Sequence, residues 1–188
     1  MAIKTFTSGE VLTAADTNTY LANSGLVYIT SGTVTTGGNL SITGCFSSTY
    51  DSYRVVVSNF ALSTAGDLEV RLSVGGSVTS AGYYWSCPLN AYANTSTYDG
   101  RGASNSATWV PLAVASTSAS GSAFEVYNPA ITTTTTIIGT RTDPRTSGLV
   151  GSFIGFLNNS TAYDGIYFSC SAGSFVNMRV RIYGYRQA

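Results

Sequence analysis

The stretch Phe175–Tyr185, FVNMRVRIYGY, decides the fold class of this chain. Within it, one set of residues alternates with a second, more polar or aromatic set: Val176, Met178, Val180, Ile182 and Gly184 against Asn177, Arg179, Arg181, Tyr183 and Tyr185. Successive side chains of a β-strand point to opposite faces of the sheet, so a period of two is typical of a strand with one buried face. The C-terminal segment therefore predicts a sheet that covers a core on one side.

Short apolar runs separated by Gly, Asn, Asp and Ser extend this pattern back to Leu26. Val, Ile, Thr, Tyr and Phe are abundant, whereas the chain has three Glu, one Gln and one Lys, so intrinsic preference favours strands. We expect strands at 26–36, 40–46, 53–62, 68–74, 82–87, 108–114, 123–127, 133–140, 149–157, 166–170 and 175–185. Because no helix intervenes, the sequence predicts an all-β fold, an antiparallel β-sandwich of jelly-roll type over residues 26–188.

Residues 1–25 differ from the rest and form a predicted N-terminal arm. Thr13 is suited to cap the start of a helix, Asp16 completes a T-x-x-D box, and Gly25 is suited to follow its end. We expect one short helix from about residue 14 to residue 23. A helix of about ten residues is too short to be stable alone in water, so it must lean on the main domain or on a partner.

The charge balance excludes several classes of function. Nine Lys plus Arg balance nine Asp plus Glu, there is no histidine, and no run of residues is apolar enough for a membrane span. A neutral chain has no electrostatic footprint for nucleic acid or anionic lipid, and without histidine the Ser/His/Asp, Cys/His and HExxH sites are excluded. We expect a non-enzymatic protein with no cofactor, no metal, and no nucleic-acid or membrane partner.

The three cysteines, Cys45, Cys87 and Cys170, lie far apart, lack CxxC spacing and fall in apolar or aromatic stretches. This pattern favours buried free thiols over metal ligands or a disulfide framework. The opening residues lack the apolar region of a secretory signal, so we expect the protein to be made in the cytoplasm.

Three Tyr-Asp elements recur, at 50–52, 98–100 and 163–165. Their carboxylates are compatible with a calcium cluster. Asp-Ser and Asp-Gly are also ordinary turn dipeptides, because Asp bonds to nearby backbone and Gly tolerates positive φ. We favour turns at Asp51, Asp99 and Asp164.

The segment 83–109 holds both tryptophans, and its middle lacks strand alternation, so we expect a long loop between two strands. We assign Tyr83, Trp85 and Trp109, at the strand ends, to the core or to subunit contacts. Aromatic faces beside amide and carboxylate groups suit a neutral sugar surface. The predicted receptor-binding residues lie in the interior of this loop: Tyr92, Asn94, Tyr98, Asp99, Arg101 and Asn105.

Both ends of the chain resemble a known family. Residues 4–21, KTFTSGEVLTAADTNTYL, resemble the N-terminal segment of many tailed-bacteriophage virion proteins, where it precedes fibre or minor structural domains. The segments 48–57, 161–165 and 180–186 look like a β-domain that recurs at the C-terminal ends of such proteins. The middle, residues 74–145, matches no motif, and the resemblance implies that variable receptor contacts lie there.

The resemblance implies a virion structural protein, and two positions on the particle stay open. One is a tail-fibre or baseplate component that contributes to host attachment; the other is a capsid decoration or head-fibre protein. A carbohydrate-active enzyme is a third class, since glycosidases need only two carboxylates. We disfavour it because Glu69 and Glu125 each lie in the middle of a predicted strand.

The expected partners follow from the same reasoning. A short polar arm cannot bury its own apolar residues, so we expect virion-anchoring contacts, to the virion or to sister chains, from the following side chains: Phe6, Val11, Leu12, Tyr20 and Leu21. The alternative is that the arm packs on its own domain. We expect a homotrimer in the virion, in contact with other virion proteins, with a host surface glycan as the candidate receptor.

Overall fold

The computed structural model describes residues 7–11, 13–16, 25–92, 98–114, 118–144 and 148–186, without the side chains of Tyr98, Asp99 and Val114. Within these ranges there is one short helix, α1 (Ala14–Asp16). The strands are β1 (Leu26–Val34), β2 (Asn39–Ile42), β3 (Ser52–Leu62), β4 (Gly66–Val74), β5 (Ser77–Val78), β6 (Tyr83–Ala91), β7 (Tyr98–Ser106), β8 (Trp109–Val114), β9 (Ser120–Tyr127), β10 (Thr135–Asp143), β11 (Leu149–Leu157), β12 (Gly165–Cys170) and β13 (Phe175–Tyr185).

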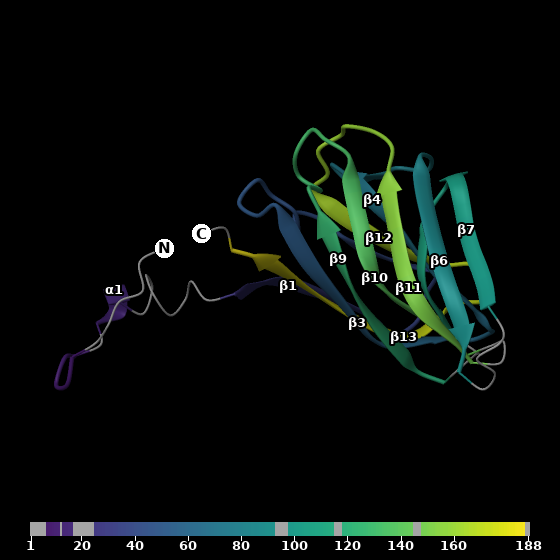
Figure 1. Cartoon of the computed structure of the whole chain (residues 1–188), viewed down its shortest axis with the longest axis horizontal. Helices are drawn as coiled ribbons and strands as arrows, with labels where there is room; N and C mark the ends of the chain where they lie inside the picture. The colour runs from purple at the N-terminus through teal and green to yellow at the C-terminus, as the bar shows by residue number, and fades with distance from the viewer. Residues whose placement is uncertain are drawn as a thin grey trace.

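The strands form two antiparallel sheets that pack face to face (Figure 1). The larger has eight strands in the order β1-β13-β3-β9-β10-β11-β6-β7, and the smaller has the order β2-β12-β4-β5, with β8 also pairing with β4. Two four-strand sets, β1-β13-β3-β9 and β2-β12-β4-β8, have the order of a jelly roll, in which the first strand lies beside the last. The predicted antiparallel all-β sandwich is confirmed.

Two inserted hairpins extend the larger sheet beyond this eight-strand core. The β6–β7 hairpin lies in the chain between β4–β5 and β8, and the β10–β11 hairpin lies between β9 and β12. They join side by side, because β11 pairs with β6, and β10 pairs with β9 of the core. We call these four strands the sheet extension. In Figure 1 it occupies the right-hand part of the sheet that faces the viewer.

Aromatic side chains fill the space between the sheets. Trp109 of β8 is fully buried and meets Tyr83 of β6 edge to face, with ring centroids 5.0 Å apart. The Tyr83 hydroxyl accepts a hydrogen bond from the backbone N–H of Leu72 on β4, at 2.8 Å, and so ties the two sheets together. Tyr83 and Trp109 are therefore core residues.

One sequence prediction about chain organisation is wrong. The segment 83–109 is a paired hairpin and not a long loop, with Ser86 opposite Gly102 and Leu89 opposite Asp99. Asp99 therefore belongs to β7 and not to a turn. The strand was missed because β7 carries small and polar residues with no apolar alternation, and backbone pairing holds it instead. A Cβ at Gly102 would lie 2.7 Å from the carbonyl oxygen of Trp85.

Two smaller differences concern the ends of the chain. Val176 was expected on the buried face of β13, but it is 43% exposed, because the β13–β3 register shifts on both sides of Asn177 and turns the side chain outward. Of the predicted helix 14–23, the structure describes Ala14–Asp16 as helical, and residues 17–23 lie outside the described part. The first strand begins at Leu26, at the predicted start of the sandwich.

Candidate functional site: an apolar hollow on the open face of the larger sheet

A hollow of about 680 Å³ lies on the sheet extension and the adjoining strand β9. We call it the sheet hollow. Its lining residues are Tyr84, Trp85 and Ser86 of β6, Ala103 of β7, Tyr127 of β9, Thr136, Ile137 and Ile138 of β10, and Ile154, Gly155 and Phe156 of β11. The volume is within the range of roughly 300–1,000 Å³ that is typical of binding pockets.

Strand alternation and register bring the exposed apolar side chains of the hollow together. Phe153 and Leu157 of β11 are buried in the sandwich, so Ile154 and Phe156 point to the opposite, outer face. Ile138 of β10 lies opposite Ile154 in the antiparallel register. Ile138, Ile154 and Phe156 are 42%, 52% and 40% exposed, so much of their apolar surface has no partner in the monomer.

One side of the hollow is formed by a stacked aromatic pair. Tyr84 lies opposite Phe156 across the β6–β11 pairing, and the two rings stack with centroids 4.9 Å apart and planes 2° apart. A stacked pair of this kind contributes about 0.5–1.5 kcal/mol beyond the burial of its area. The pair therefore fixes a rigid aromatic wall at one side of the hollow.

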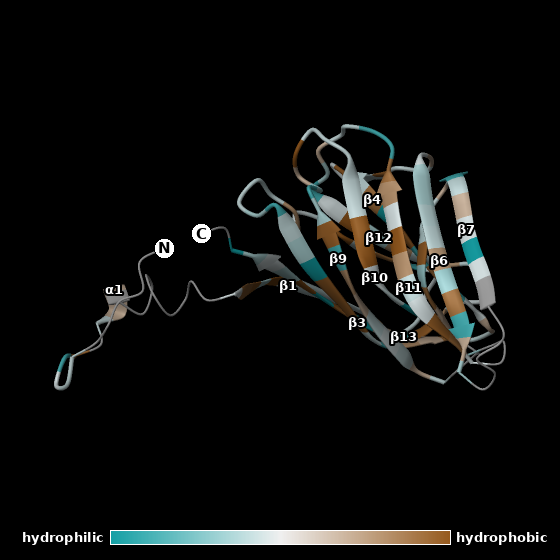
Figure 2. Ribbon diagram, viewed as in Figure 1, coloured by the Kyte–Doolittle hydropathy of each residue, from teal (hydrophilic) through white to brown (hydrophobic). Residues whose placement is uncertain are grey.

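The chemistry of the lining is apolar with a few hydroxyl groups. None of its residues carries a carboxylate, an amide, an amine or a guanidinium side chain. The side-chain hydroxyls of Tyr84, Ser86, Tyr127 and Thr136 make no hydrogen bond to another described residue. Figure 2 shows the matching concentration of hydrophobic residues along β10 and β11. Such a lining is suited to contact with another surface and carries no group for proton transfer near neutral pH.

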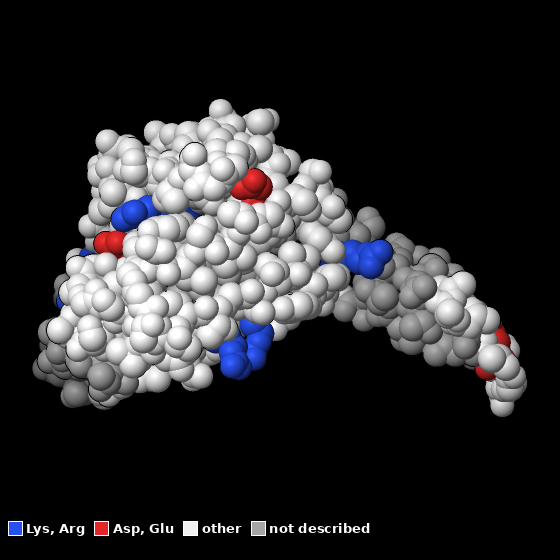
Figure 3. Space-filling model, turned by 180° about the vertical axis from the view of Figure 1, so that it is seen from behind, with Lys and Arg blue, Asp and Glu red and all other residues white. Residues whose placement is uncertain are grey.

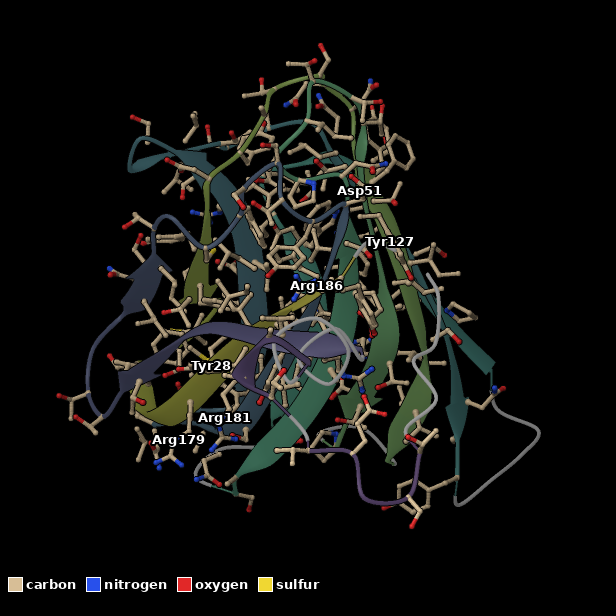
Figure 4. The ribbon with its side chains drawn as sticks, turned by 90° about the vertical axis from the view of Figure 1, so that its left-hand side faces the viewer. Tyr28, Asp51, Tyr127, Arg179, Arg181 and Arg186 are labelled. Atoms are coloured by element: carbon tan, nitrogen blue, oxygen red, sulfur yellow. The ribbon has the colours of Figure 1, made fainter. Side chains whose placement is uncertain are left out.

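Charged residues border the hollow on the side of the jelly-roll core. Glu125 of β9 lies opposite Ile138, and its Oε1 is 2.8 Å from Nη1 of Arg54 on β3. Further along the same sheet, Arg179 and Arg181 of β13 form no ion pair with a described residue and lie opposite Thr33 and Ser31 of β1 (Figure 4). Charged side chains are also sparse on the opposite side of the molecule (Figure 3).

A cluster of charged side chains lies inside the sandwich and links the sheet extension to the smaller sheet. Arg141 of β10 and Asp143 of β10 are 1% and 0% exposed. Nη2 of Arg141 lies 2.8 Å from Oδ1 of Asp67 on β4 and 3.5 Å from Oδ2 of Asp143, and Nη1 donates to the carbonyl oxygen of Val110 on β8. Nη1 of Arg101 on β7 lies 3.0 Å from Oδ2 of Asp143.

Of the six predicted receptor-binding residues, three have described side chains, Tyr92, Arg101 and Asn105. Arg101 turns inward to Asp143, and Oδ1 of Asn105 accepts a hydrogen bond from the backbone N–H of Gly82, at 3.1 Å. Tyr92 is 72% exposed and lies against Gly148. Asn94 is outside the described residues, and Tyr98 and Asp99 are described only as backbone of β7. Their predicted role in receptor binding stays a prediction.

Of the predicted anchoring residues, only Val11 lies in the described part of the chain, where it is 77% exposed. Phe6, Leu12, Tyr20 and Leu21 lie outside that part. The described arm residues include a local hydrogen bond from the Glu10 backbone N–H to the Thr7 carbonyl oxygen, at 3.0 Å. The anchoring role also stays a prediction.

The cysteines are free thiols, with Cys45 and Cys87 buried and Cys170 half-buried. Burial raises the pKa of the Cys45 thiol to about 12 and that of Cys87 to about 11.

Among the described residues, no group of three or more carboxylates and thiols is arranged to hold a metal ion. No helix among them has the length and apolarity that a membrane crossing requires.

Sequence reasoning missed the hollow, although one signal for it was present. The second half of the run 149–157 places apolar residues on both faces of the strand. Phe153 and Leu157 lie on one face, and Ile154 and Phe156 lie on the other. A strand that is apolar on both faces is typical of one that is covered on both sides.

The fold and the site define a class: a jelly-roll sandwich whose larger sheet is extended by two hairpins that carry an exposed apolar hollow. No protein-family model matches the chain, and no curated protein matches its sequence.

Proposed function

We propose that the chain is a non-enzymatic structural protein of a bacteriophage virion, a tail-fibre or baseplate component that contributes to host attachment. The observation that carries the proposal is the sheet hollow, a rigid, uncharged and largely apolar surface that is suited to binding. The resemblance of residues 4–21 to the N-terminal segments of virion proteins supplies the assignment to a virion.

The position of the hollow in the sequence supports the same proposal. The sheet extension comes from residues 83–106 and 135–157. Its strands β6, β7 and β10 lie within residues 74–145, where variable receptor contacts are expected, and β11 follows that segment. These hairpins are additions to the eight strands that form the jelly roll, so the binding surface is carried by the part of the fold that varies most easily.

Immunogold labelling of intact virions with antibodies against the sandwich tests the assignment. Label at the tail tip or baseplate is the expected result. Label distributed over the head would instead favour the capsid decoration or head-fibre alternative, and particles without label would contradict both.

Deletion of residues 1–25 tests the role of the arm. The sandwich begins at Leu26, so the truncated chain is expected to keep a β-rich circular dichroism spectrum and to be missing from purified particles. A matched control replaces residues 1–25 with a Gly/Ser linker of equal length. Incorporation of either variant at the normal level would contradict an anchoring arm.

A further inference from the structure

We propose that the outer face of β1 and β13 is a binding site for an acidic polysaccharide, in which Arg179 and Arg181 hold the carboxylate or phosphate groups of the polymer. The site lies on jelly-roll strands of the larger sheet and is separate from the sheet hollow. This goes beyond the proposed function, since binding by the purified chain does not depend on where the protein lies on a particle.

The first argument is a local excess of positive charge in a chain whose formal net charge is zero at pH 7. The neighbouring strands β1, β13, β3 and β9 contain three arginines and one glutamate. Arg54 and Glu125 pair with each other, at 2.8 Å. Arg179 and Arg181 form no ion pair with a described residue. Two like charges on one strand repel each other, and a bound anion offsets that repulsion.

Strand geometry places the two guanidinium groups side by side. Arg179 and Arg181 are two positions apart on β13, so their side chains leave the same face of the strand, roughly 7 Å apart. Val180 between them is fully buried, so both arginines point outward from the sandwich (Figure 4). The planar fork of a guanidinium matches the oxygens of a carboxylate or a phosphate, which makes the pair suited to acidic groups along a polymer.

Hydroxyl groups of the neighbouring strand add donors to this face. In the β1–β13 register, Ser31 lies opposite Arg181 and Thr33 lies opposite Arg179, and both hydroxyl side chains are exposed. The Tyr28 hydroxyl donates to Oγ of Ser31, at 3.0 Å, which leaves the Ser31 proton free for an external acceptor. Neither β1 nor β13 contains Asp or Glu, so no carboxylate of these strands competes with an anionic ligand.

An aromatic pair beside the donors indicates that the anion belongs to a sugar polymer. Tyr183 follows Arg181 on the same face of β13, and its ring meets that of Tyr28 edge to face, with centroids 5.8 Å apart. Tyr28 is 56% exposed, so its ring is accessible for stacking on a sugar ring. A nucleic acid carries a charge on every nucleotide and needs a broader basic surface than two arginines supply.

Three dextrans with the same neutral backbone test the proposal on the full chain: unmodified dextran, carboxymethyl dextran and dextran phosphate. We expect at least one charged dextran to bind at least about 10-fold more tightly than unmodified dextran in isothermal titration calorimetry. The charged dextran with the higher affinity identifies the acidic group. Added salt is expected to weaken this binding, because the site is exposed to solvent.

Variants locate the binding on the proposed face. Arg179→Gln and Arg181→Gln are each expected to lower the affinity for the charged dextran at least about 10-fold, because each removes charged hydrogen bonds. Tyr28→Ala is expected to lower it at least about 3-fold through loss of stacking. The matched control is Arg71→Gln on β4, which removes one positive charge from the smaller sheet and is expected to keep the affinity of the unchanged chain. Circular dichroism checks the fold of every variant.

Three results would overturn the proposal. The first is that unmodified dextran binds as tightly as both charged dextrans, or that none of the three binds. The second is that folded Arg179→Gln and Arg181→Gln chains bind as tightly as Arg71→Gln. The third is that polyglutamate or single-stranded DNA binds more tightly than the charged dextrans, since the partner would then be an acidic protein or a nucleic acid.

Discussion

Arg141 of β10 reaches across the sandwich to Asp67 of β4, with Nη2 of the arginine 2.8 Å from Oδ1 of the carboxylate. The contact joins the sheet extension to the smaller sheet from the inside, and the buried Asp143 lies beside it. Removing the guanidinium takes one ion-pair partner from the fully buried carboxylate of Asp143, which also pairs with Arg101. The Arg141–Asp67 ion pair therefore adds a polar link between the two sheets beneath the sheet hollow.

We expect Arg141→Ala to lower the free energy of unfolding by about 3–5 kcal/mol, the usual loss when one partner of a buried ion pair is removed. Urea denaturation followed by circular dichroism measures the change. The control is Arg179→Ala, whose exposed guanidinium makes no ion pair with a described residue; its effect should stay within about 0.5 kcal/mol. Equal losses in the two variants would contradict a stabilising role for the buried cluster.

Two glycine substitutions test the close approach of strands in the extension. A Cβ at Gly151 would lie 1.9 Å from the carbonyl oxygen of Pro88 on the neighbouring strand β6. Gly151→Ala should therefore cost at least about 2 kcal/mol of stability. Gly38→Ala is the control, since nothing lies within 4 Å of its added Cβ and its φ is not positive; it should be neutral or slightly stabilising. Thermal unfolding of both variants measures this difference in stability. A Gly151→Ala chain as stable as the Gly38→Ala chain would show that β6 and β11 separate easily at this position.

Stability should fall as the pH rises above about 9. Burial raises the pKa of Cys45 to about 12 and of Cys87 to about 11, from 9.0 for an exposed thiol. Between these values the unfolded chain ionises its thiols while the folded chain keeps them protonated, so ionisation favours unfolding. Each thiol contributes at most about 1.4 kcal/mol per pH unit over its own interval.

Urea midpoints measured at pH 8, 9, 10 and 11 test this dependence. The Cys45→Ala, Cys87→Ala double variant should lose stability less steeply with pH than the unchanged chain, whatever its stability at pH 8. Some slope should remain, because burial also raises the pKa of Tyr53 and Tyr83. Identical slopes would mean that the two thiols are not buried in the folded state.

The receptor-binding prediction is best tested at Tyr92. Its side chain is 72% exposed, so Tyr92→Ala should change stability by less than about 1 kcal/mol and reduce adsorption of the particle to host cells. Arg101→Ala is a poor test, because loss of the ion pair with Asp143 should lower stability by about 1–3 kcal/mol. Normal adsorption by a stable Tyr92→Ala particle would remove this residue from the receptor site.

Much of the fold was predictable because local patterns encode it. The alternation in 175–185 and the apolar runs before it correspond to eleven of the thirteen strands, and the missed ones are β5 and β7. β5 has two residues, and β7 is an edge strand of small and polar residues held by backbone pairing to β6. Neither carries the side-chain pattern on which sequence reasoning depends.

The candidate site was less predictable because it depends on register between distant segments. Arg101 and Asp143 are 42 positions apart in the chain, and no local pattern indicates that the guanidinium turns inward to this carboxylate. Tyr84 and Phe156 stack only because β6 and β11 are neighbours, although they are separated by four other strands in the sequence. The double-sided apolar pattern of β11 was the one available signal.

The order of strands in the larger sheet also makes one inserted hairpin dependent on the other. Among the described residues, the β6–β7 hairpin joins the larger sheet through the pairing of β6 with β11. The β6–β7 hairpin therefore depends on the β10–β11 hairpin for its place in the sheet, whereas the β10–β11 hairpin pairs directly with β9 of the jelly roll. Deletion of β10–β11 would therefore remove the pairing partner of β6 as well, whereas deletion of β6–β7 would leave β11 as the edge strand of the larger sheet.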